Sequence, residues 1–88
     1  MTLHVNGATY TASDRARLAR QYDRVYSVMS DGEWRTLRDI SSYTSSPEAS
    51  VSARLRDARK DGNIVLRRRV PGGNGLHEYK LLTGAVAL

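Results

Sequence analysis

Apolar residues recur at helical spacing in the first third of the chain. They share one face of a helix that we expect from about Ala12 to Ser30, because positions three, four and seven apart lie on the same side of a helix. A capping box of Thr11 and Asp14 predicts its start, and Asp31-Gly32 predicts its end. The apolar face comprises Leu18, Tyr22, Val25, Tyr26 and Met29, and the opposite face carries Arg15, Arg17, Arg20 and Arg24.

Short strands are predicted on both sides of this helix. Before it, two alternating segments flank Asn6-Gly7, a pair of residues that favours a tight hairpin turn. We therefore expect a β-hairpin extension over residues 1–11. After the helix, Glu33-Trp34-Arg35 is long enough for a single bridging strand, in which Trp34 is expected to anchor the core.

Two shorter helices follow, separated by a polar break at residues 44–46. Thr36 can cap a second helix from Leu37 to about Tyr43, with Leu37 and Ile40 facing inward. Pro47 suits the first position of a third helix, because the missing N–H has no partner there in any case. The third helix should end at Asp61-Gly62 and bury Val51, Leu55 and Ala58.

Apolar and polar residues alternate in the C-terminal third, which predicts a pair of strands. Residues 64–70 and 76–82 are the expected strands, and the glycine-rich segment 71–75 is the turn between them. Helix, short strand, two helices and a hairpin, in that order, predict an α+β fold of the winged helix-turn-helix type. We expect this domain, with three helices and a two-stranded wing, over residues 12–82, followed by a tail over residues 83–88.

The positive charge of the chain is concentrated in one segment. The 88 residues carry 14 lysines and arginines against 9 acidic residues, a net charge of +5. Residues 54–69 hold seven of the basic residues and two of the acidic ones, which accounts for the whole excess. Such a concentrated excess is typical of a protein that binds a polyanion. The alternative interpretation is that these charges only form a solvated surface.

The exposed face of the third helix is expected to enter the major groove of DNA, which admits one helix. Its side chains are mostly short, which permits close approach, and Arg56 can reach a base edge or the adjoining phosphate. The residues assigned to this face are Ser46, Glu48, Ala49, Ser52, Ala53 and Arg56.

Further basic residues are expected to contact phosphates, namely Arg59 and Lys60 at the end of the helix and Arg67 and Arg69 on the hairpin stem. Alternation along the strand puts Arg68 on the other face, where it can cover the apolar layer or pair with an acid. The hairpin turn contains no lysine or arginine, so the stem rather than the turn is expected to contact the phosphate backbone of DNA.

Three segments resemble small winged helix-turn-helix proteins of tailed phages and prophages: residues 34–40, 47–57 and 75–81, together with the arginine run between them. The resemblance implies DNA binding in phage gene control or replication, in the cytoplasm of a bacterial host. Two positions differ from that family, which has glycine near Ser45 and often leucine in place of Ala58.

The sequence contains little that supports other functional classes. There is no cysteine, the two histidines have no metal-ligand spacing, and the serines have no evident base, so we expect no enzyme, metal, cofactor or small-molecule ligand. His77 should be partly buried. No apolar run is long enough to cross a membrane.

Double-stranded DNA is thus the expected partner, and dimerisation or tandem sites are expected because one helix makes few contacts. The alternative is a winged-helix module that docks on a host or phage protein. RNA is disfavoured, since no exposed aromatic platform for base stacking is evident.

Overall fold

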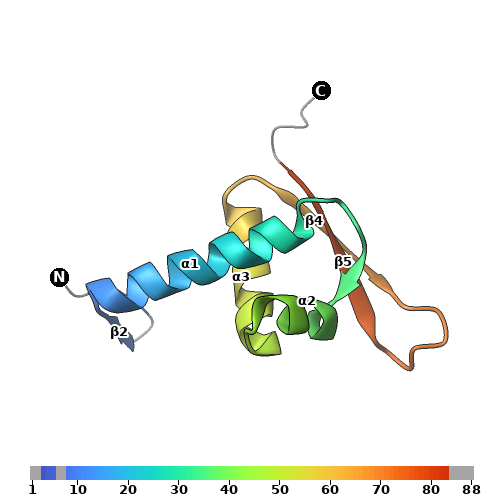
Figure 1. The fold of residues 1–88 in the computed structure, drawn as a ribbon, viewed down its shortest axis with the longest axis horizontal. Helices are drawn as coiled ribbons and strands as arrows, with labels where there is room; N and C mark the ends of the chain where they lie inside the picture. The colour runs from blue at the N-terminus through green and yellow to red at the C-terminus, as the bar shows by residue number, and fades with distance from the viewer. Residues whose placement is uncertain (1–2, 6–7, 84–88) are drawn as a thin grey trace.

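The computed structural model describes residues 3–5 and 8–83, and Figure 1 shows their arrangement. This part of the chain is a small α+β fold with three helices, a three-stranded antiparallel sheet and a separate two-stranded hairpin. The elements are β1 (Leu3–Val5), β2 (Ala8–Tyr10), α1 (Ala12–Met29), β3 (Arg35–Thr36), α2 (Leu37–Thr44), α3 (Glu48–Lys60), β4 (Ile64–Arg69) and β5 (His77–Leu82).

The N-terminal hairpin lies at the far end of α1, away from the rest of the molecule (Figure 1). Strands β1 and β2 pair antiparallel, as predicted. The expected Asn6-Gly7 turn and the tail from residue 84 onward lie outside the described residues. Among the described residues, none of the helices is long and apolar enough to cross a membrane.

The sheet has three strands where a two-stranded wing was predicted, because the predicted bridging strand joins the wing and spans Arg35–Thr36 instead of residues 33–35. Strands β4 and β5 form the expected hairpin, and β3 adds to the other side of β5 in the order β3-β5-β4. Arg35 lies opposite Tyr79 and Thr36 opposite Glu78. The extended link before α2 therefore runs beside the hairpin and bridges it to the helices. The resulting architecture is compatible with a winged helix.

The helix ends follow local capping rules. The predicted capping box of Thr11 and Asp14 is present at the start of α1, and Thr36 caps α2 together with Asp39. Helix α2 ends at Ser45, whose backbone is left-handed with φ 56° and ψ 35°. Pro47 is the residue before the first turn of α3 rather than the first helical residue, a shift of one position.

The core lies where the three helices meet the inner face of the sheet. The predicted stripe of Val51, Leu55 and Ala58 on α3 is buried, as are Val25 and Met29 on α1. The remaining buried apolar residues are Ile40, Val65 and Leu81. Tyr22 and Tyr26 pack against this core at its edge. Burial of the α3 stripe fixes which side of that helix remains available to a partner.

Trp34 does not anchor this core, contrary to the prediction. It is half-buried and lies against the outer face of the sheet, where the Arg68 guanidinium is 4.0 Å from its ring centroid and Lys80 Nζ is 5.8 Å away. Val65 and Leu81 point to the helices, so Arg68 and Lys80, at odd spacing from them, point to the opposite side. The indole covers that second face.

Candidate nucleic-acid interface

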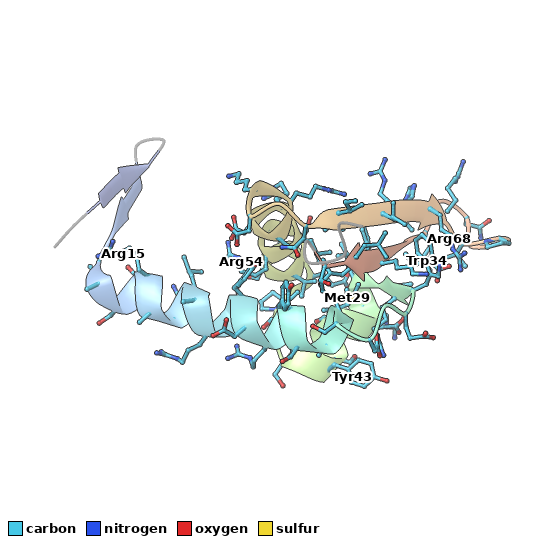
Figure 2. All side chains as sticks on the ribbon, turned by 90° about the horizontal axis from the view of Figure 1, so that it is seen from above. Arg15, Met29, Trp34, Tyr43, Arg54 and Arg68 are labelled. Atoms are coloured by element: carbon cyan, nitrogen blue, oxygen red, sulfur yellow. The ribbon has the colours of Figure 1, made fainter. Side chains whose placement is uncertain are left out.

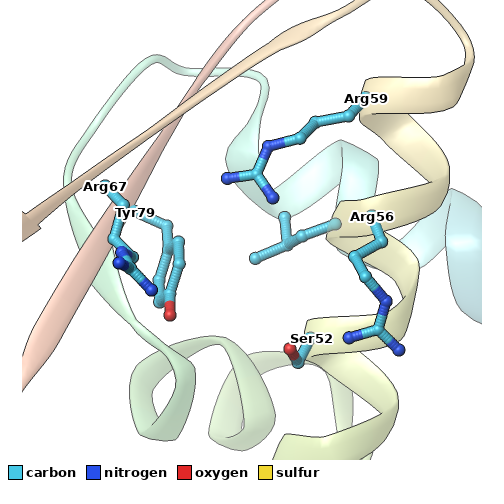
Figure 3. A pocket seen from close by; sticks show the side chains of 6 residues that line it. Ser52, Arg56, Arg59, Arg67 and Tyr79 are labelled. Carbon is cyan, nitrogen blue, oxygen red and sulfur yellow. The ribbon is translucent and has the colours of Figure 1, made fainter.

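A groove separates α3 from the β4–β5 hairpin. It has a volume of about 400 Å³. Figure 3 shows side chains from the helix on one side and from the hairpin on the other. The lining residues are Ser52, Leu55, Arg56 and Arg59 from α3, Arg67 from β4 and Tyr79 from β5. Three guanidinium groups and two hydroxyls thus line the groove, and no carboxylate does.

Strand alternation determines which hairpin arginines lie on the groove side. Val65 is buried against the helices, so Arg67 and Arg69, two and four residues further on, share its face. Arg67 lies directly opposite Tyr79 in the pairing of β4 with β5. Both arginines are exposed, and neither forms an ion pair with another described residue.

Arg68 lies on the other face, as predicted. Its Nε is 2.6 Å from Glu78 Oε1, and its guanidinium stacks on Trp34 (Figure 2). The positive charge of Arg68 is therefore balanced by a neighbouring carboxylate. Of the three consecutive arginines, Arg67 and Arg69 remain available to an anion on the groove side.

Arg54 belongs to the basic segment in the sequence but lies inside the fold. Its side chain is 12% exposed, its Nε is 3.0 Å from Asp57 Oδ2, and it donates to Gln21 Oε1 of α1 at 3.2 Å. Figure 2 places it where α3 approaches α1. Arg54 therefore joins two helices, and its charge does not contribute to the groove.

Arg59 spans from α3 to the sheet. Its Nη2 donates to the Val65 carbonyl oxygen at 3.1 Å, so the guanidinium is held across one end of the groove (Figure 3). Arg56 and Lys60 are exposed and form no ion pair with any described residue. The free cations of this region come from α3 and β4 together.

Ser46 is not on the exposed face of α3, contrary to the prediction. It is 3% exposed, its carbonyl oxygen accepts from the Ser41 hydroxyl at 2.6 Å, and its own hydroxyl donates to the Thr44 carbonyl oxygen at 3.4 Å. The left-handed Ser45 reverses the chain, so Ser46 folds back under α2.

The other predicted residues of the helix face are accessible to different degrees. Glu48 and Ala49 are exposed, and Ser52 and Ala53 are half-buried. Glu48 lines a second, smaller cavity of about 170 Å³ between the two helix starts and the hairpin turn. His77, half-buried as predicted, also lines it.

Tyr79 is the residue of the site that sequence reasoning did not single out. It packs partly against the core and lines both cavities, so it divides the groove from the space beside Glu48. The signal was its place on β5, two residues before Leu81 and therefore on the same inner face. Only the pairing of β4 with β5 brings it beside Arg67.

The described residues contain no group of three histidines, cysteines or carboxylates that could hold a metal ion. No protein-family model matches the chain, and neither the curated proteins nor the solved structures give a significant match.

Proposed function

We propose that this protein binds double-stranded DNA as a winged helix-turn-helix domain. In this proposal α3 lies in the major groove, and the stem of the β4–β5 hairpin contacts the phosphate backbone. The sequence resemblance suggests the setting, which is transcription control or replication of a phage or prophage inside a bacterial host.

One observation carries the proposal: the unpaired cations of α3 and of β4 lie on the same side of the molecule. Two arginines of the basic segment, Arg54 and Arg68, are balanced by carboxylates elsewhere in the fold. The five that remain are Arg56, Arg59, Lys60, Arg67 and Arg69. A surface that gathers unpaired cations from two elements attracts a polyanion.

The shape of α3 supports the same proposal. Ala49 is exposed and Ala53 half-buried, and both side chains are small enough to let the helix backbone approach base edges closely. Glu48, exposed in the first turn, can accept a hydrogen bond from the amino group of cytosine. Side chains for backbone contact and for base contact are thus present on one helix.

The salt dependence of binding tests this proposal. Five cations that each displace a counterion from the DNA predict that log K falls against log salt with a slope of roughly −4 to −5. Fluorescence anisotropy of a labelled duplex, measured from about 50 to about 200 mM salt, gives this slope. Absence of binding at the lowest salt would refute the proposal.

A protein-interaction module is the second candidate, and one observation favours it. Ile64 and Leu66 are 56% and 39% exposed and lie on the outer face of the sheet, away from the groove. Exposed apolar side chains in a cluster are typical of protein-binding surfaces. The same titration separates the two candidates, because a protein-interaction module has no reason to bind duplex DNA with a steep salt dependence.

A further inference from the structure

We infer that the groove between α3 and the β4–β5 hairpin is a seat for one phosphate group, which in the DNA complex belongs to the backbone. This inference rests on the proposed function and deepens it. It assigns a defined ligand to the groove and a specific role to three side chains beyond a general positive charge.

The chemistry of the lining favours a phosphate. Guanidinium groups only donate hydrogen bonds, and phosphate oxygens only accept them, so Arg56, Arg59 and Arg67 match the ligand in both charge and hydrogen bonding. The hydroxyls of Ser52 and Tyr79 can add donors. Adenine and cytosine each present an amino donor in the major groove, for which the lining offers no carboxylate or amide acceptor.

Part of the seat is already held in place. The hydrogen bond from Arg59 to the Val65 carbonyl oxygen fixes that guanidinium across the groove, and its remaining N–H groups are available to an anion. Tyr79 is half-buried and faces Arg67 across the strand pair. A ligand that enters therefore orders fewer side chains than it would on an open surface, which lowers the entropic cost of binding.

Neighbouring charge restricts the anion to this groove. On the other side of Tyr79, the smaller cavity is lined by Glu48. An exposed carboxylate disfavours a phosphate there, although Arg38 also lines that cavity. The larger groove has three cations and no acid, so it is the favoured position for an anion.

Docking on DNA gives the groove a natural occupant. If α3 lies in the major groove and the hairpin lies beyond its rim, the backbone strand at that rim passes between the two elements. Of the two targets expected for Arg56, a base edge or the adjoining phosphate, this docking selects the phosphate. Base selection is left to the other exposed residues of the helix.

Inorganic phosphate tests the seat in the absence of DNA. NMR spectra of the protein are recorded as phosphate replaces chloride at constant ionic strength. We expect saturable shifts at Ser52, Arg56, Arg67 and Tyr79, and about tenfold weaker binding in Arg56→Gln. Tyr79→Phe should also weaken phosphate binding while keeping the ring that packs on the core.

Arg69→Gln is the matched control, because it removes the same charge from the same face of β4 but lies outside the groove lining. Its phosphate affinity should stay near that of the parent protein. Shifts that never saturate would overturn the inference. So would an Arg69→Gln variant that loses as much phosphate affinity as Arg56→Gln does.

The same variants with duplex DNA separate the inference from the proposed function. We expect Arg56→Gln to weaken binding to two duplexes of unrelated sequence by the same factor, since both contain phosphates. A changed preference between the duplexes would overturn the seat. Saturable phosphate binding without DNA binding would keep the seat for free phosphate and refute the proposed function. DNA binding without a phosphate response would refute the seat and keep the proposed function.

Discussion

Arg35 links the end of α1 to the start of β3 through one side chain. Its two terminal nitrogens lie 2.8 Å from the two carboxylate oxygens of Asp31, and Nη1 also donates to the Val28 carbonyl oxygen at 3.2 Å. The pair therefore ties the end of α1 to the start of β3. The hydrogen bonds from Arg35, followed by one from the Glu33 N–H, lower the pKa of Asp31 from 3.8 to about 2.

This pair predicts a specific pH dependence of stability. A carboxyl whose pKa is lower in the folded protein stabilises it fully above the unfolded pKa of 3.8, and the contribution disappears as the pH falls through about 2. We expect Asp31→Asn to lower the thermal midpoint at neutral pH and to match the parent near pH 2. Thermal unfolding followed by circular dichroism at several pH values measures this difference.

Asp23→Asn serves as the control, since Asp23 is exposed on α1 and forms no ion pair with a described residue. Its midpoint should follow that of the parent across the whole range. A constant difference between Asp31→Asn and the parent from neutral pH to pH 2 would contradict the assignment of the pKa shift to the Arg35 pair.

Ser45 adopts a left-handed backbone conformation that glycine accepts more readily. Replacing Ser45 by glycine removes the steric cost of its Cβ, so we expect Ser45→Gly to raise the free energy of unfolding by about 0.5–1 kcal/mol. Ser42→Gly, in the exposed part of α2, should instead lower it by about 0.5 kcal/mol. Urea unfolding measures the free energy of unfolding of both variants. Equal destabilisation by Ser45→Gly and Ser42→Gly would show that Ser45 is not in a left-handed conformation.

Among the elements, α3 has one face buried in the core and another exposed to solvent. Val51 is fully buried, whereas Ala49, two residues earlier, is exposed. Val51→Asp should unfold the domain, because an unpaired buried carboxylate costs several kcal/mol and total stability is about 5–15 kcal/mol. Ala49→Asp should keep the fold and lose DNA affinity. Circular dichroism checks the first expectation, and a folded Val51→Asp variant would invalidate the assigned helix phase.

The elements were predictable because their signals are local. Apolar periodicity located the three helices, and the alternation around a glycine-rich turn located β4 and β5. The errors concern residues whose surroundings depend on tertiary contacts. Trp34 packs outside the core because β3 joins the sheet, and Ser46 is buried because Ser45 reverses the chain.

The candidate site was predictable only in part, for the same reason. Sequence position grouped seven basic residues but could not separate those that pair internally. Arg54 is neutralised by Asp57 on its own helix, and Arg68 by Glu78 across the strand pair. The groove itself depends on how α3 sits against the hairpin, which brings Tyr79 and Arg67 opposite Arg56.

At the scale of the whole molecule, the sheet separates two surfaces of different character. The groove side carries unpaired arginines, whereas the outer side carries Trp34, a paired Arg68, Lys80 and exposed apolar residues. Consecutive arginines of β4 therefore lie on opposite faces of the sheet, and the proposed function assigns DNA contact to one face only. The difference between the two faces can be tested without knowledge of a DNA target sequence.

The most direct measurement compares Arg67→Gln with Arg68→Gln in duplex DNA binding across a salt series. Both variants lose the same charge at adjacent positions, and circular dichroism verifies that each is folded. We expect Arg67→Gln to bind about tenfold more weakly than the parent protein, with a salt slope smaller by about 1. Arg68→Gln should bind nearly as the parent does, because its charge lies on the far face of the sheet. Equal losses in the two variants, or a larger loss in Arg68→Gln, would show that the groove side of the sheet is not the side that binds DNA.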